Sequence, residues 1–143
     1  MKQSFIFLYT SIIFSLSIFG SALEKFTFDN WGKPDLDVFY HLPDTIDENT
    51  NILFIIHGNS RNPDDYLKTW KKLTKGKNVA LFAPHFKRNL FVSFNTLQMS
   101  TSNGDIRSNS DLYLNNSIDI LLEYVKSKFD LKNPKYDIYG HSA

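Results

Sequence analysis

The chain has 143 residues, of which 42% are hydrophobic, 15% aromatic and 22% charged, and its formal net charge is +1. This composition is typical of a globular protein and excludes a disordered chain, and the near-neutral charge gives no support for a nucleic-acid partner. The sequence contains no cysteine, which excludes disulfides and thiolate metal sites.

The first 22 residues have the pattern of a signal peptide. Lys2 supplies a positive charge, an apolar run extends from Phe5 to Phe19, and Gly20-Ser21-Ala22 places small residues before a cleavage site. The alternative is a retained membrane anchor, but a run of about 15 residues is shorter than the ~20 that a membrane-spanning helix needs. We therefore expect residues 1–22 to be cleaved, leaving no stable membrane anchor, and a secreted or periplasmic product to begin at Leu23.

Extended and helical segments alternate along the rest of the chain. Short apolar runs, bounded by turn residues, predict strands over residues 36–42, 52–56, 79–83 and 136–139. The segment from 86 to 109 has no regular pattern, and a long irregular connection inside a compact domain is often functional.

A helix is predicted after the strand at 52–56. Asn62 can serve as its N-cap, Pro63 suits the first helical position, and Gly76 can adopt the left-handed conformation that ends a helix. An apolar stripe at helical spacing predicts its buried face, which consists of Tyr66, Leu67, Trp70 and Leu73.

A second amphipathic helix is predicted between Leu114 and Phe129, because apolar residues recur there at helical spacing. The order of strands and helices predicts an α/β fold with a doubly wound, mostly parallel sheet covered on both faces. Three buried strands and two crossover helices do not complete such a domain, and the last strand would be an unprotected edge. We therefore expect residues 23–143 to be the N-terminal part of a domain, truncated shortly after its last strand.

The residues Gly140-His141-Ser142-Ala143 directly follow the last predicted strand. A nucleophilic serine on a sharp strand-to-helix turn needs small neighbours two residues before and after it, because its backbone is strained. Gly140 supplies the first small residue, and the second position falls beyond Ala143. The triplet alone could be an ordinary glycine-serine turn, but its place after a buried strand and two strand–helix units favours a nucleophile.

A second motif, His57-Gly58-Asn59-Ser60-Arg61, directly follows the strand at 52–56. Both motifs therefore lie at the carboxyl ends of predicted parallel strands, which is where open α/β sheets place their active sites. A glycine in such a turn lets the chain reverse with its amide groups facing a cavity.

Together the two motifs resemble those of the α/β-hydrolase superfamily, whose nucleophile elbow has the pattern G-x-S-x-G. The resemblance extends over most of residues 23–143. The sequences HGNSR, APHF and GHSA are most similar to those of exported esterases related to polyhydroxyalkanoate depolymerases.

This resemblance implies a role for each motif residue. Ser142 is expected to be the nucleophile, and the backbone N–H groups of Asn59 and Ala143 are expected to form the oxyanion hole. The residues expected to support the two turns are His57, Gly58 and Gly140. In the same family the chain order is serine, acid, histidine, so both partners of the serine are expected beyond residue 143.

Other candidate residues are not assigned a catalytic role, and the acids Asp105, Asp130 and Asp137 come too early in the chain to serve the serine. The resemblance implies that His141 is structural and points away from the site; His41 ends an early strand, and His85 could line the pocket. Arg61 has two open interpretations, because it could anchor the oxyanion turn through a carboxylate or be solvated.

The resemblance implies a serine hydrolase that cleaves a carboxylic ester, small or polymeric, through an acyl-enzyme on Ser142, with no metal and no cofactor. Two alternatives remain open. One is a serine peptidase of the same fold, which would use the same groups. The other is a non-catalytic binding protein that kept the turn but lost its catalytic partners.

Cleavage of the signal peptide is the first testable prediction. Amino-terminal sequencing of the expressed protein should begin at Leu23, because the small residues before it form the cleavage site. An intact Met1 in the membrane fraction would contradict cleavage and favour the anchor.

Overall fold

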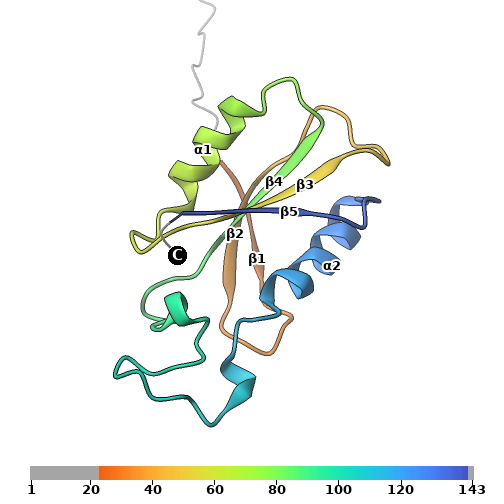
Figure 1. The fold of residues 1–143 in the computed structure, drawn as a ribbon. Helices are drawn as coiled ribbons and strands as arrows, with labels where there is room; N and C mark the ends of the chain where they lie inside the picture. Colours follow the sequence, from red (N-terminus) through yellow and green to blue (C-terminus); the bar gives the residue numbers. More distant parts are fainter. Residues whose placement is uncertain (1–22, 142–143) are drawn as a thin grey trace, which may run out of the picture.

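A five-stranded mixed sheet with a helix on each face organises the computed structural model, which describes residues 23–141 (Figure 1). The predicted signal peptide at residues 1–22, together with Ser142 and Ala143, lies outside the described residues. The elements in chain order are β1 (Glu24–Phe28), β2 (Leu36–His41), β3 (Asn51–Ile56), α1 (Pro63–Leu73), β4 (Val79–His85), two short 3₁₀ turns at Phe94–Thr96 and Ser110–Leu112, α2 (Ser117–Phe129) and β5 (Asp137–Gly140).

The strand order is β1-β2-β4-β3-β5. Strands β4, β3 and β5 are parallel, which confirms the predicted α/β class and its crossover helices. Strand β2 runs antiparallel to β4, and β1 runs antiparallel to β2. Strand β1 was not predicted, although Phe26 and Phe28 alternate there with polar residues in the manner of a half-buried strand.

Neighbouring residues of the central strands face opposite sides of the sheet, and each side packs against one helix. Phe54 and Phe82 lie in the cluster that contains the α2 residues Leu121 and Val125. Leu53, Ile55, Leu81 and Ala83 lie in the other cluster, with Leu67 of α1. Continuous apolar runs at 52–56 and 79–83 are therefore explained by strands that are buried on both faces.

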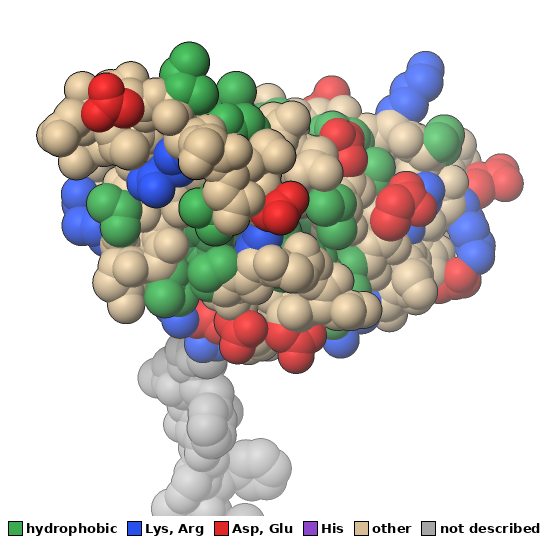
Figure 2. All heavy atoms as spheres, turned by 90° about the horizontal axis from the view of Figure 1, so that it is seen from below, with side chains coloured by type: hydrophobic (Ala, Val, Ile, Leu, Met, Phe, Trp, Pro, Cys, Tyr) green, Lys and Arg blue, Asp and Glu red, His purple; other side chains and the backbone are tan. Residues whose placement is uncertain are grey.

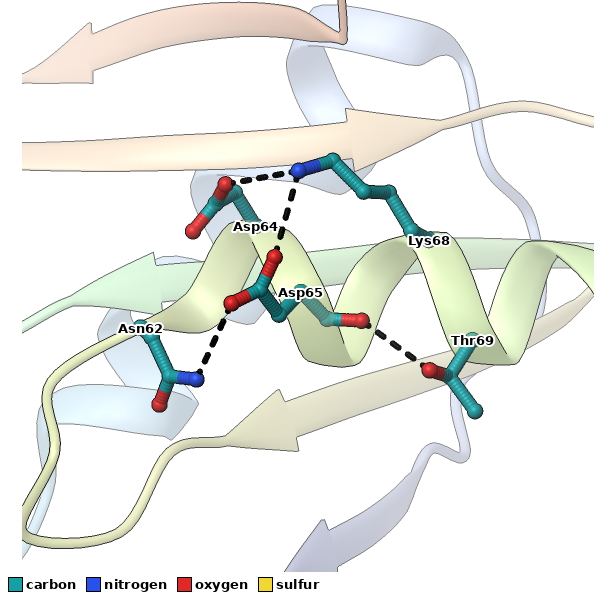
Figure 3. A network of polar contacts seen from close by, with 5 residues as sticks. All are labelled: Asn62, Asp64, Asp65, Lys68 and Thr69. Atoms are coloured by element: carbon teal, nitrogen blue, oxygen red, sulfur yellow. Dashed lines mark hydrogen bonds and ion pairs between the residues drawn. The ribbon is translucent and has the colours of Figure 1, made fainter.

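The first turn of α1 carries a network of polar contacts on the surface (Figure 3). Lys68 Nζ lies 2.9 Å from Asp64 and 3.2 Å from Asp65, and Asn62 Nδ2 donates to Asp65 at 3.2 Å. Asn62 stands at the N-cap position, as expected, but its side chain makes no capping bond to a backbone N–H. The acidic residues of the first turn lie at the positive end of the helix dipole.

Three boundaries differ from the sequence prediction by more than one residue. Helix α1 ends at Leu73, three residues before Gly76, and Leu73 is 60% exposed instead of belonging to the buried stripe. Strand β4 continues past Pro84 to His85, where proline was expected to end it. The pairing with β3 ends at Phe82, so only β2 pairs with the last residues of β4. Helix α2 begins at Ser117, so the buried Leu114 belongs to the segment before it.

The segment between β4 and α2 lacks long elements but makes many local bonds. The backbone N–H of Leu114 donates to Leu97 at 2.8 Å, and Arg107 donates to the carbonyl of Ser100 at 3.1 Å. Figure 2, which views the molecule from below, shows hydrophobic side chains among charged ones of both signs. The large hydrophobic residues that this segment exposes are Leu90, Val92, Leu97, Met99, Ile106 and Leu112.

Within residues 23–141, every helix is too short or too polar to cross a lipid bilayer.

Two leucines of α1 provide a matched test of this packing. Leu67 is fully buried, whereas Leu73 is 60% exposed, although the sequence pattern assigns both to one stripe. We expect Leu67→Ala to lower the free energy of unfolding by about 2–5 kcal/mol, because it leaves a cavity in the core. Leu73→Ala should change it by less than about 0.5 kcal/mol.

Denaturant unfolding of the natural-length protein measures both values. Equal losses in the two variants would show that α1 presents a different face to the sheet.

Candidate active site

The two sequence motifs leave neighbouring strands at the same edge of the sheet. Ile56, the last residue of β3, is paired with Gly140, the last residue of β5, and the two strands are parallel. In Figure 1 both strands accordingly run toward the same side of the molecule. The turn that begins at His57 and the turn that begins at His141 therefore start side by side. Ser142 and the N–H of Ala143 lie outside the described residues.

His57 is fully buried, and both of its ring nitrogens meet backbone groups. Nε2 lies 3.0 Å from the N–H of Phe86, and Nδ1 lies 3.0 Å from the carbonyl of Gly58. Because Nε2 accepts a hydrogen bond from the N–H of Phe86, the ring proton must be on Nδ1, which donates to the carbonyl of Gly58. Burial lowers the pKa of His57 to about 4, so the ring is neutral near pH 7. These contacts are those of a histidine that supports the turn, and they leave it no free nitrogen for proton transfer.

Arg61 holds the same segment from the other end of the motif. Its Nη1 donates to the carbonyl of Phe86 at 2.7 Å and its Nη2 to the carbonyl of Phe91 at 3.3 Å. The guanidinium carbon also lies 4.5 Å from the centre of the Phe94 ring, a cation–π arrangement. Arg61 therefore anchors the turn, as one of the two interpretations expected, but its partners are backbone carbonyls instead of a carboxylate.

The turn itself is short and its central residue is exposed. The backbone N–H of Arg61 donates to the carbonyl of Gly58 at 3.1 Å, and Arg61 has a left-handed backbone with φ of 56°. Asn59 is exposed at the tip, and its carbonyl accepts a bond from Nη2 of Arg88. Nη1 of the same guanidinium lies 3.4 Å from the side-chain oxygen of Asn59.

Sequence reasoning missed Arg88, although one signal was available. Arg88 comes shortly after β4, which is the parallel neighbour of β3, so it reaches the same edge of the sheet as Asn59. The bond to the Asn59 carbonyl fixes one end of that residue. Arg88 therefore limits how the peptide groups of the turn can rotate.

The remaining histidines have different neighbours. His141 Nδ1 is 2.9 Å from the hydroxyl of Tyr66 on α1, so this ring is directed toward the helix. His85 is partly buried beside His57, with ring centres 6.0 Å apart, and burial lowers its pKa together with the charge of Lys87. His41 ends β2, and because β2 is antiparallel to β4, it lies at the opposite edge of the sheet.

The acids that the sequence analysis set aside are also distant in the topology. Asp137 begins β5 and is paired with Leu53, so it lies at the far end of the strand from Gly140. Asp130 ends α2, and Asp105 lies in the irregular segment. Among residues 23–141, no group of three histidines or acids is arranged to hold a metal ion.

The low pKa of His57 makes stability depend on pH. The folded state binds this proton only near pH 4, whereas the unfolded state binds it near pH 6.5, so acid favours unfolding. Between pH 7.5 and pH 4.5, we expect His57 to account for about 2–3 kcal/mol of lost stability. The His57→Gln variant has no group that titrates at this position. Its free energy of unfolding should therefore fall by about 2–3 kcal/mol less than that of the wild type between pH 7.5 and pH 4.5.

Denaturant unfolding at both pH values compares the two proteins, and all other titrating groups cancel in the difference. Parallel pH profiles would show that His57 is not buried in its neutral form.

Comparisons with known proteins bear on the fold. No family model matches the sequence, and curated protein sequences yield no significant match. Among solved structures, poly(aspartic acid) hydrolase-1 from Sphingomonas sp. KT-1 is similar with a TM-score of 0.73 and 31% identity, over 83% of this chain and 46% of that chain. A poly(3-hydroxybutyrate) depolymerase from Bordetella parapertussis is similar with a TM-score of 0.69 and 18% identity, over 85% of this chain and 43% of that chain.

The chain thus spans less than half the length of either structure. The chain therefore has the α/β-hydrolase fold, as the sequence motifs predicted.

Proposed function

We propose that the protein is a serine hydrolase that cleaves carboxylic esters through an acyl-enzyme on Ser142. The observation that carries this proposal is the pairing of Ile56 with Gly140. Because of this pairing, the turn with Asn59 and the segment that leads to Ser142 begin at the ends of adjacent strands, at one edge of the sheet. A nucleophile and an oxyanion donor need this proximity, because both must reach the same carbonyl group.

The proposed reaction assigns each group one task. The hydroxyl oxygen of Ser142 attacks the ester carbonyl carbon, and its proton passes to a histidine base. The N–H groups of Asn59 and Ala143 donate to the oxyanion of the tetrahedral intermediate. The histidine then gives the proton to the departing alcohol as the ester bond breaks, and water hydrolyses the acyl-enzyme by the reverse sequence of proton transfers.

The described contacts support a fixed oxyanion turn. His57 and Arg61 bind the two sides of Phe86, and Arg88 binds the carbonyl of Asn59. A donor that is already oriented stabilises the developing charge without reorganisation during the reaction, which is worth about 3–4 kcal/mol per donor in enzymes of this kind. His57 takes no part in proton transfer in this scheme.

A second candidate is hydrolysis of an amide bond in a polymer. It is favoured by the 31% identity to a protein named poly(aspartic acid) hydrolase-1, because poly(aspartic acid) is joined by amide bonds. The other similar structure is named for a polyester. Both names describe hydrolases of polymers, and the same serine, oxyanion donors and histidine would serve either bond. Release of a chromophore from a p-nitrophenyl ester and shortening of poly(aspartic acid) distinguish the two.

Covalent labelling of the natural-length protein tests the nucleophile. A fluorophosphonate probe should label the wild type, because a serine beside an oxyanion hole is activated, and Ser142→Ala should abolish labelling. His141→Ala serves as the matched control, since it changes the adjacent residue, whose ring contacts Tyr66. We expect this variant to retain most of the labelling.

Labelling that survives Ser142→Ala would exclude this serine as the nucleophile. An unlabelled wild type that is folded and has no hydrolytic activity would favour the non-catalytic binding protein.

A further inference from the structure

A groove of about 700 Å³ lies at the opposite edge of the sheet from the two turns. One wall is the last part of α1 and the connection that leads into the first residue of β4. The other wall is the chain that follows His41, the last residue of β2. Apolar side chains of Leu23, Pro43 and Val79 contribute to the lining.

Lysine dominates the charge of this groove. The lining includes Lys68, Lys71, Lys72, Lys75 and Lys77, and Asp44 is the one carboxylate that the described part of the chain contributes to it. Five of the 16 lysines and arginines of the chain therefore line this one groove, although the net charge of the whole chain is only +1.

Four of these lysines lack an ion-pair partner within residues 23–141. Lys68 is paired with Asp64 and Asp65 at the start of α1 (Figure 3), whereas the other four make no ion pair with a described carboxylate. The dipole of α1 accounts for part of the pattern, since basic residues stabilise the last turn of a helix. It does not account for Lys75 and Lys77, because the helix ends at Leu73.

We propose that this groove binds a linear polycarboxylate, such as an acidic polypeptide. Four unpaired ammonium groups along one groove attract a chain with repeated negative charges, and a single small anion would satisfy only one or two of them. Side chains one helical turn apart have Cβ atoms about 6 Å apart. Carboxylates on the same side of an extended polypeptide recur about every 7 Å, which is within reach of these flexible side chains.

The lining disfavours nucleic acid as the ligand. Proteins that bind single strands stack bases on aromatic rings, and within residues 23–141 no Phe, Tyr or Trp lines the groove. The lining does include Leu23, which would carry a free ammonium group if residues 1–22 are removed. Cleavage would therefore add a positive charge to the groove.

Binding of fluorescently labelled poly(glutamic acid) to the natural-length protein tests the proposal, with fluorescence anisotropy as the readout. We expect the double variant Lys72→Gln/Lys75→Gln to bind about 5-fold more weakly, because it removes two of the exposed charges of the groove and each exposed charge pair contributes modestly. Added salt should weaken binding by the wild type. The double variant Lys132→Gln/Lys135→Gln makes the same charge change at exposed residues outside the groove, and it should change Kd by less than about 2-fold.

Equal weakening in the two double variants would overturn the groove as the binding site. Tighter binding of single-stranded DNA of matched charge, lost in the groove variant, would overturn the polycarboxylate assignment. The proposal is independent of the ester hydrolase function, because the groove variant should keep its turnover of a p-nitrophenyl ester. A wild type that binds the polymer but turns over no ester would contradict only the hydrolase.

Discussion

Phe86 is bound from both sides by the first and last residues of one short motif, and the candidate site depends on this arrangement. Its N–H donates to the buried ring of His57, and its carbonyl accepts a bond from Arg61. Because Phe86 directly follows β4 and the motif directly follows β3, the two bonds join the ends of neighbouring parallel strands. The turn at Asn59 is therefore anchored at both ends before any substrate arrives.

Arg61 adopts a backbone conformation that is costly for a residue with a long side chain. A φ of 56° is uncommon outside glycine, asparagine and aspartate, and it directs the chain from the turn into α1. Two carbonyl bonds and the contact with the Phe94 ring offset this cost. Lysine could not replace it, because a single ammonium group cannot span two carbonyls and stack on a ring in the same way.

Local patterns predicted most of the fold, and contacts between distant segments set the limit. Buried strands were identified from the apolar runs at 52–56 and 79–83, and a crossover helix from the residues that begin a helix around Pro63. These signals depend only on residues that are close in the sequence. Strand β1 was missed because its alternation of apolar and polar residues is short. Its burial also comes from distant aromatic rings of α2, such as Tyr124, whose ring centre lies 4.9 Å from that of Phe28. The partners of Arg61 could not be predicted either, because Phe86 and Phe91 meet it only through the pairing of β3 with β4.

The strand order also determines how the chain can assemble. Leu53 of β3 is paired with Leu81 of β4, which is 81 − 53 = 28 residues away in the sequence. It is also paired with Asp137 of β5, which is 137 − 53 = 84 residues away. Closing the longer loop costs about 1 kcal/mol more in chain entropy, because that cost grows with the logarithm of loop length. We expect β3, α1 and β4 to form the folding nucleus and β5 to dock later. On this order of assembly, the strand that leads to Ser142 reaches its neighbour only after the anchored turn has formed, and folding chains pass through a stage without the two turns side by side.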